Sequence, residues 1–321
     1  MSAGYVGNCT VSNRTVDPEY TSDTSSGVGR MATGATLMRD AIRVRDALGL
    51  PNREARSEVE LLLMRALDIT RAQLIARPEL AMQAASNQPY LESLRRRLTG
   101  EPIAYILGKR EFYGSVFDVS SDVLIPRPET ELLVDMALEH IDQHKLNSVL
   151  DLGTGSGAIA IEIAKERPNV DMVAVDVSQK ALDIALTNSE HLLRDRRRIH
   201  FIVSDWFEQL HGTHFDLIVS NPPYIAEDDQ HLELGDVSFE PRQALVGGRD
   251  GLDHLRLIIE QAPRHLADGG WLLFEHGYDQ AAVSRELLIE AGYAEPVSER
   301  DLAGHVRVSG GRWLTSASGT G

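Results

Sequence analysis

The most chemically distinctive residues of the chain stand together as Asn221-Pro222-Pro223-Tyr224, one residue after the largely apolar run 216–219. The run is rich in β-branched residues and predicts a buried strand, which must end at the prolines because proline has a fixed φ and no N–H. A backbone stiffened by two prolines would hold the Asn221 side chain and the Pro222 carbonyl in place as two hydrogen-bond acceptors. Tyr224 adds a flat face on which a planar group can stack.

Two acceptors and a ring suit a planar –NH2 group, as found in an amide or a nucleic-acid base. Such a nitrogen is a weak nucleophile because its lone pair is delocalised. Accepting both of its hydrogens places negative charge on the nitrogen as it attacks, which stabilises the transition state, and holding it in line with a methyl group adds proximity. The same residues are also explained by a strand end with a packed tyrosine, because Asn-Pro is a common turn signal.

A glycine-rich loop separates a strand pattern at 148–153 from a helix pattern at 157–167. Glycine permits positive φ and lets a ligand approach the backbone closely, and the helix that follows offers unpaired N–H groups. Asp176 ends the next strand pattern, where a carboxylate can hold a ribose hydroxyl. The residues of the loop are Gly153, Thr154, Gly155, Ser156 and Gly157.

Two classes of enzyme share this loop and its acid. With Ala158 the loop satisfies G-x-G-x-x-A, the fingerprint of nicotinamide- and flavin-dependent oxidoreductases. A methyltransferase that uses S-adenosylmethionine also needs an acidic residue to bind the ribose of that cofactor. A third interpretation is a glycine turn that binds no ligand. Asp151 favours methyl transfer, because a carboxylate entering the loop would repel a pyrophosphate but suit a cationic sulfonium. A dehydrogenase has no evident use for the corner at Asn221.

Two further strand ends carry candidate residues. Asp205 and Trp206 follow the third strand pattern, where they can hydrogen-bond and stack an adenine ring, although a core tryptophan is the alternative. Glu275 and His276 end the strand pattern at 270–277. They form either a strand-end hydrogen bond or a contact beside the cofactor.

Alternating strands and helices over residues 129–321 predict an α/β fold with a doubly wound, mostly parallel sheet covered on both faces by helices. Ligands of such sheets bind outside the carboxyl ends of the strands, which is where the glycine loop, Asp176 and Asn221 stand. Strand patterns cover 148–153, 171–176, 199–205, 215–221 and 270–277, with two short strands at the end. Helix patterns cover 129–144, 157–167, 178–192, 251–266 and 284–292.

The part of the chain before residue 129 is organised differently. Residues 1–35 are rich in Ser, Thr, Gly and Asn and predict a disordered extension. Residues 36–100 show helical periodicity, including a helix capped by Ser57, and predict a small helical domain. Residues 101–128 contain short β-like runs and predict a β-hairpin linker.

Composition narrows the classes of function. The 321 residues carry a net charge of −16, so no direct contact with nucleic acid is expected, and the basic runs at 95–97 and 194–198 predict solvated faces. No stretch approaches the roughly 18 apolar residues of a membrane-spanning helix, so no membrane contact is expected. One cysteine rules out an internal disulfide and fits a cytoplasmic protein. His140 and His144 lack a third ligand and predict two exposed histidines, with no metal site.

The motifs together resemble a known family, the HemK-type protein-(glutamine-N5) methyltransferases. The stretches DLGTGSGAIAI, AVDVS, SDWF and IVSNPPYI carry the resemblance in this order, together with GEPIAYILGKREFYG, VLIPRPETELLV, GDVSFEPRQALVGGRDGL and LLFEHG. The resemblance begins at about residue 39 and is greatest to the peptide chain release factor glutamine methyltransferases. It implies a Rossmann-like, class I S-adenosylmethionine-dependent methyltransferase domain over residues 129–321.

The resemblance implies methylation of the glutamine amide in the Gly-Gly-Gln motif of class-1 peptide chain release factors, with S-adenosyl-L-methionine as donor. The helical domain and hairpin would grip the release factor, with Arg127 and Glu129 shaping the cleft, and the chain is expected to be a monomer. The alternative is another planar amine, a ribosomal-protein glutamine or adenine N6. The glutamine would be held by Asn221, Pro222, Pro223 and Tyr224, of which Asn221, Pro222 and Tyr224 are the expected catalytic residues. The cofactor would be held by Gly153, Thr154, Gly155, Ser156, Gly157, Asp176, Asp205, Trp206 and Asn221.

Overall fold

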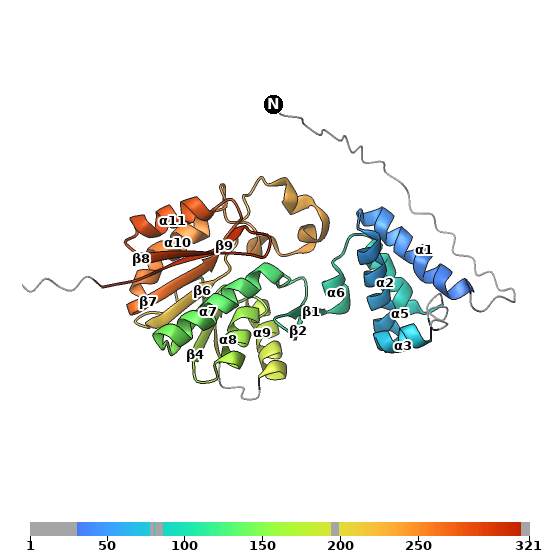
Figure 1. Cartoon of the computed structure of the whole chain (residues 1–321), viewed down its shortest axis with the longest axis horizontal. Helices are drawn as coiled ribbons and strands as arrows, with labels where there is room; N and C mark the ends of the chain where they lie inside the picture. Colours follow the sequence, from blue (N-terminus) through green and yellow to red (C-terminus); the bar gives the residue numbers. More distant parts are fainter. Residues whose placement is uncertain (1–30, 78–79, 81–85, 194–198, 316–321) are drawn as a thin grey trace, which may run out of the picture.

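The computed structural model comprises a helical N-terminal part, a β-hairpin and an α/β part (Figure 1). The helices of the N-terminal part stand beside the sheet rather than on it. Within the described residues, no helix is long and apolar enough to cross a membrane. The basic run at 194–198 and most of the predicted extension lie outside the described residues, which are 31–77, 80, 86–193 and 199–315.

The described part of the α/β region is built on a seven-stranded sheet in the order β5-β4-β3-β6-β7-β9-β8. Strands β3 to β7 pair in parallel, and β9 is antiparallel to both of its neighbours, which confirms the predicted mostly parallel, doubly wound sheet. From β3 the chain adds β4 and β5 on one side of the sheet and then β6 and β7 on the other. The loops that follow β3 and β6 therefore lead in opposite directions and leave a crevice at the carboxyl ends of these two strands. The bounds are β3 (Ser148–Leu152), β4 (Asp171–Asp176), β5 (Ile199–Val203), β6 (Phe215–Ser220), β7 (Leu266–Glu275), β8 (Ala294–Arg300) and β9 (Val306–Arg312).

Helices cover both faces of the sheet because its strands are apolar on both sides (Figure 1). Neighbouring residues of a strand point to opposite faces, so Val149 packs in the core under α7 and α8 and Leu150 in the core under α10 and α11. Helix α9 continues the first layer beside α8. The bounds are α7 (Glu131–His144), α8 (Ala158–Glu166), α9 (Gln179–Leu192), α10 (Asp253–Gln261) and α11 (Ala281–Glu290).

The helical N-terminal part has an apolar core of its own, which includes Val59, Leu62 and Leu94. The predicted cap at Ser57 is wrong, because α2 begins at Asn52 directly after Pro51 and Ser57 lies inside the helix. Helix α1 begins at Met31, inside the range 1–35 that was predicted to be a disordered extension. The bounds are α1 (Met31–Leu48), α2 (Asn52–Leu67), α3 (Arg71–Ala76) and α5 (Gln88–Leu98).

The linker departs from its prediction at its first segment. The β-like run after Pro102 forms a short helix, α6, which ends where Gly108 adopts a positive φ of 70°. Five apolar residues are too few for their periodicity to distinguish a helix from a strand, and the proline before them and the glycine after them favour the helix. Tyr113 and Gly114 have φ values of 50° and 74°, as the central residues of a tight hairpin turn require. The bounds are α6 (Ile103–Leu107), β1 (Lys109–Phe112) and β2 (Ser115–Asp118).

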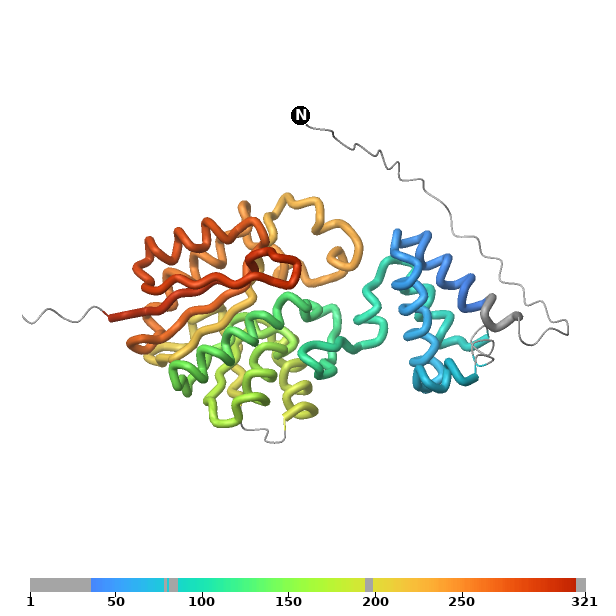
Figure 2. Tube along the Cα trace, viewed as in Figure 1, coloured from blue at the N-terminus to red at the C-terminus, as the bar shows by residue number. Residues whose placement is uncertain are grey.

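A buried arginine joins the helical part to the α/β part. Arg97 on α5 is 2% exposed, and its guanidinium donates to both carboxylate oxygens of Glu58 at 2.8 and 3.0 Å. Its Nη1 also donates to Asp236 at 3.0 Å. Asp236 lies on the 3-10 helix Gly235–Phe239, in the long loop that extends from the α/β part toward the helices (Figure 2). The solvated face predicted for 95–97 is therefore wrong at Arg97.

We predict that Arg97→Met destabilises the chain by about 3–5 kcal/mol, because it leaves the buried carboxylate of Glu58 without a partner. Urea unfolding followed by circular dichroism measures the loss. The double variant Arg97→Met with Glu58→Met should recover most of it, since a buried ion pair can be replaced by packed apolar groups. Asp236→Asn is the matched control and should cost at most about 1 kcal/mol, because its carboxylate is 40% exposed. A small effect of Arg97→Met would contradict the role of this contact.

Candidate functional site

The glycine loop and the proline corner leave the sheet side by side. Leu152 and Ser220 are register partners at the ends of β3 and β6, and the Ser220 hydroxyl donates to the Leu152 carbonyl at 2.9 Å. Gly153 and Asn221 are the next residues of the two strands. The parallel pairing therefore brings together two motifs that are far apart in the sequence.

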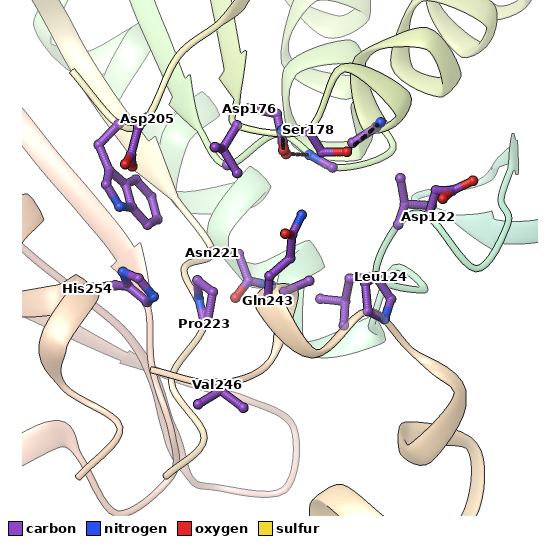
Figure 3. A pocket seen from close by; sticks show the side chains of 18 of the residues that line it. Asp122, Leu124, Asp176, Ser178, Asp205, Asn221, Pro223, Gln243, Val246 and His254 are labelled. Atoms are coloured by element: carbon purple, nitrogen blue, oxygen red, sulfur yellow. Dashed lines mark hydrogen bonds between the residues drawn. The ribbon is translucent and has the colours of Figure 1, made fainter. Parts of the chain in front are cut away.

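A cavity of about 300 Å³ opens at these strand ends (Figure 3). Asp205 and His254 border one end of it and Asp122 and Leu124 the other, with Asn221 between them. The predicted cofactor residues that line it are Gly153, Gly155, Asp176, Asp205, Trp206 and Asn221. Thr154, Ser156 and Gly157 are not among its lining residues, and the first two are buried in the loop.

The glycines of the loop have distinct roles, although all three have positive φ. Gly155 donates its N–H to Asp176 Oδ2 at 2.9 Å, and a Cβ added there would meet nothing within 4 Å, so its open side faces space that a ligand can enter. A Cβ added to Gly157 would lie 2.8 Å from Ile161 Cδ1 and 3.1 Å from Ala185 Cβ. Gly157 is therefore required where α8 packs closely on α9.

Asp151 supports the loop from within the protein. It is fully buried and is not among the described residues that line the cavity, so the structure does not place its carboxylate against a ligand as the sequence suggested. Its Oδ2 accepts a hydrogen bond from the Thr154 hydroxyl at 2.7 Å. Burial raises the pKa of Asp151 from 3.8 to about 7, although the bond from Thr154 acts in the opposite direction.

Asp176 and Trp206 border the cavity with defined orientations. The carboxylate of Asp176 accepts the N–H groups of Gly155 at 2.9 Å and Ser178 at 2.8 Å. Burial raises the pKa of Asp176, and these N–H donors lower it. Trp206 is partly buried, with a positive φ of 48°, and its ring lies 5.2 Å from that of His254. A strained backbone that turns the ring into a cavity favours a ligand contact over a purely structural tryptophan.

Several residues that line the same cavity were not predicted from the sequence. Asp122 and Leu124 belong to the predicted linker, for which no contact with the cofactor was expected, and His254 lies near the start of α10. Leu124 and Gln243 come from stretches that carried part of the family resemblance, which was the one signal that could have found them. Local patterns do not reveal these residues, because the fold brings them to the cavity from other elements.

A second cavity, of about 270 Å³, lies on the other side of the corner. Asn221 lines both cavities, whereas Pro222 and Tyr224 line the second and Pro223 the first. Arg127 and Glu129 also line the second cavity, where the sequence predicted that they shape a cleft. Asn221 thus stands where the two cavities meet.

A buried glutamate ties Arg127 and the linker to the loop that follows the corner. Glu240 forms an ion pair with Arg127, and its Oε2 accepts the N–H of Ile125 at 3.2 Å. Burial raises the pKa of Glu240, and the charge of Arg127 opposes that effect. These contacts hold the linker and the loop together at the second cavity.

The backbone after the corner is held by a returning segment. Ile225 donates its N–H to the Leu245 carbonyl at 2.9 Å and accepts the N–H of Gly247 at 2.8 Å. A Cβ added to Gly247 would lie 2.5 Å from the Pro223 carbonyl oxygen, so the two backbones are in direct contact. The prolines and this contact together fix the position of the corner.

Hydrogen bonds also hold the corner's side chains. Asn221 Nδ2 donates to Thr130 Oγ1 at 3.0 Å, and Thr130 Oγ1 donates to Glu275 Oε2 at 2.6 Å. The Tyr224 hydroxyl donates to Glu275 Oε1 at 3.0 Å. Burial raises the pKa of the Tyr224 phenol, and the neighbouring carboxylate raises it further.

The histidines singled out in the sequence have structural contacts. His276 is buried and its ring nitrogens contact the Gly277 carbonyl at 2.8 Å and the Ser309 hydroxyl at 2.9 Å, which corresponds to the strand-end hydrogen bond. His140 is buried against Trp271, with ring centroids 4.6 Å apart, so its predicted exposure is wrong. Across the described ranges, no group of three or more His, Cys, Asp or Glu residues could hold a metal ion.

Comparison with known proteins identifies related sequences for both parts of the chain. The family model of the methyltransferase small domain matches residues 129–244, and that of the PrmC N-terminal domain matches residues 47–108. A release factor glutamine methyltransferase of Burkholderia pseudomallei is 50% identical over 259 residues, which cover 79% of this chain and 91% of the relative. One of Pseudomonas aeruginosa is 45% identical over 284 residues, which cover 88% of this chain and 99% of the relative.

A solved structure resembles the fold. The catalytic domain of hMettl16, solved in complex with MAT2A 3'UTR hairpin 6, superposes with a TM-score of 0.51. It is 18% identical and the match covers 71% of this chain and 84% of that one.

We predict that Gly157→Ala destabilises the chain by about 2–4 kcal/mol, because it combines a positive φ with a Cβ that collides with α8 and α9. Gly155→Ala is the matched control, since its φ is also positive but the added Cβ meets open space, and it should cost only about 1 kcal/mol. Urea unfolding of the two variants measures the difference. Equal losses would contradict the packing role of Gly157.

We predict a specific pH dependence of stability from Asp151. Its native pKa of about 7 lies above its ordinary value of 3.8, so between these values the native state retains a proton that the unfolded state releases. Its contribution to the free energy of unfolding is complete below the unfolded pKa and is lost as pH rises through the native pKa, by at most about 1.4 kcal/mol per pH unit. Asp151→Asn should therefore gain stability relative to the unmodified chain as pH rises from 4 to 7. A constant difference in unfolding free energy across that window would contradict the raised pKa.

Proposed function

The chain belongs to the family of release factor glutamine methyltransferases, and we propose that its two neighbouring cavities separate the methyl donor from the methyl acceptor. The proposed donor is S-adenosyl-L-methionine in the first cavity. The proposed acceptor is the side-chain amide nitrogen of the glutamine in the Gly-Gly-Gln motif of a class-1 peptide chain release factor, in the second. The observation that supports this proposal is that Asn221 lines both cavities.

The first cavity fits the donor in size and chemistry. About 300 Å³ lies within the range of small-molecule sites. Gly155 exposes backbone on its open side, where the amino-acid end of the cofactor can approach, and the carboxylate of Asp176 can accept ribose hydroxyls through its remaining lone pairs. Asp205 and the ring of Trp206 are suited to hydrogen-bonding and stacking the adenine. Thr154, Ser156 and Gly157 would act through the shape of the loop.

The corner supplies the chemistry that the protein itself contributes. When bound, S-adenosyl-L-methionine supplies an electrophilic methyl group. Because Asn221 Nδ2 is committed to Thr130, its Oδ1 is the atom that the side chain offers to a substrate N–H. With the Pro222 carbonyl as a second acceptor, both amide hydrogens can be held while Tyr224 packs against the amide plane. Acceptors fixed in this way place negative charge on a weak nitrogen nucleophile and orient its lone pair.

The remaining surface is proposed to recognise the protein substrate. The linker and the loop that carries Asp236 line the second cavity together with the corner, and the Arg97 contact joins the helical part to that loop. The net charge of −16 disfavours a nucleic-acid substrate. We propose that the chain acts as a monomer in the cytoplasm, where its substrate takes part in translation termination.

The proposal predicts that Asn221→Ala lowers the rate constant for methyl transfer about 10²–10³-fold, because one preorganised acceptor is lost. Labelled S-adenosylmethionine is incubated with the purified release factor, and transfer to a ribosomal protein and to DNA is measured in parallel. The affinity for S-adenosylhomocysteine, measured by calorimetry, should change by no more than severalfold. Full activity of the variant would refute the role of the amide. Transfer to DNA rather than protein would refute the choice of substrate, since the corner alone also fits adenine N6.

A further inference from the structure

The strongest unassigned feature lies behind the corner, in the carboxylate of Glu275 at the end of β7. The residue is 1% exposed, and each of its carboxylate oxygens accepts a hydroxyl, one from Thr130 and one from Tyr224. Thr130 is itself 4% exposed and is not among the described residues that line either cavity. One buried carboxylate thus connects, directly or through Thr130, to both Asn221 and Tyr224.

The direction of these hydrogen bonds follows from elementary chemistry. A threonine hydroxyl carries a single hydrogen, and an ionised carboxylate only accepts. The hydrogen of Thr130 therefore goes to Glu275 at 2.6 Å, and the lone pairs of its oxygen are what it presents to Asn221 at 3.0 Å. Asn221 must face Thr130 with its NH2 group, which turns its carbonyl oxygen to the other side.

The charge of Glu275 is compensated from several sides. Burial raises the pKa of the Glu275 carboxyl, while the hydroxyls of Thr130 and Tyr224 and the charge of Arg307 act in the opposite direction. Arg307 lines the second cavity with Glu275, and its Nε also donates to Asp301 at 3.1 Å. A carboxylate that receives two hydroxyls is satisfied in its ionised form, which is the form that orients Thr130.

We propose that Glu275 and Thr130 are positioning residues for methyl transfer. They fix the amide of Asn221 with its oxygen toward the substrate nitrogen, and Glu275 also holds the ring of Tyr224. With the amide reversed, the corner would present a donor to a substrate –NH2 group, and two donors repel. The hydrogen bonds that run from Glu275 through Thr130 to Asn221 are called the relay below. The relay therefore selects for a methyl-accepting nitrogen that still carries its hydrogens. This inference rests on the role of Asn221 proposed above.

Thr130→Val tests the relay because it keeps the shape of the side chain and removes the hydroxyl. The rate constant for methyl transfer should fall about 10–100-fold, less than on losing the acceptor itself. The KM for the release factor should change by no more than severalfold, because Thr130 lines neither cavity among the described residues. The dissociation constant of S-adenosylhomocysteine should be unchanged for the same reason. Thr130→Ser restores the hydroxyl and should recover most of the rate.

A double-mutant cycle distinguishes positioning from a general structural effect. If Thr130 acts through Asn221, Thr130→Val causes no further loss of rate when it is added to Asn221→Ala. An equal loss in both backgrounds, or full activity of Thr130→Val alone, would overturn the proposal. The variant Thr187→Val is the control for replacing a threonine by a valine, because the Thr187 hydroxyl donates to the backbone carbonyl of Asp183 on the exposed face of α9. This variant should keep full activity.

Glu275→Gln tests the carboxylate that accepts the hydroxyls of both Thr130 and Tyr224. A glutamine has one acceptor oxygen, so it can satisfy only one of the two hydroxyls, and the rate should fall at least as far as in Thr130→Val. Unchanged activity of Glu275→Gln would overturn the proposed role of the carboxylate. If the unmodified chain methylated a different planar amine, the proposed substrate would be wrong, and the same cycle measured on that amine would still test the relay.

Discussion

The pairing of β3 with β6 is the constraint on which the site depends. Leu152 and Ser220 are partners at the last position of each strand, and the hydroxyl of Ser220 bonds to the backbone of Leu152. Since both strands run in the same direction, Gly153 and Asn221 leave the sheet at the same edge. The reversal of strand order beside β3 leaves that edge open. A change in register between these strands would separate the glycine loop from the corner, although each motif would keep its local sequence.

The corner is rigid because its support comes from distant elements. The prolines limit its backbone, the segment that returns through Gly247 packs against the Pro223 carbonyl, and the carboxylate of Glu275 holds its side chains. The last of these contacts uses Thr130, which lies after the linker and directly before α7. Arg97 and Asp236 connect the helical part to the loop that follows the corner. The helical part is therefore bonded to the same loop that forms one wall of the proposed substrate site.

The sequence predicted the sheet and its strand ends well because those features have local causes. Strands buried on both faces must be apolar throughout, prolines must end β6, and glycines must occupy the positive-φ turns after β3. The run before Gly108 was predicted to be β-like because five apolar residues are too few to show a helical period. Asp151 was predicted to lie near a ligand because a sequence pattern does not indicate how deeply a side chain is buried. The relay through Thr130 could not be predicted, since Thr130 and Glu275 are 145 residues apart in the chain. Hydrogen bonds between residues so far apart in the chain form only in the folded protein, whereas a sequence motif describes residues that are adjacent in the chain.

Mapping the transferred methyl group shows whether the corner holds an amide nitrogen for methylation, as proposed. The chain is incubated with labelled S-adenosylmethionine and a class-1 release factor, and the modified residue and atom are identified by fragmentation mass spectrometry. We expect one methyl group on the side-chain nitrogen of the Gly-Gly-Gln glutamine, and none on a release factor whose motif is Gly-Gly-Ala. A methyl group on another residue of the release factor, or on a nucleic-acid base, would contradict it.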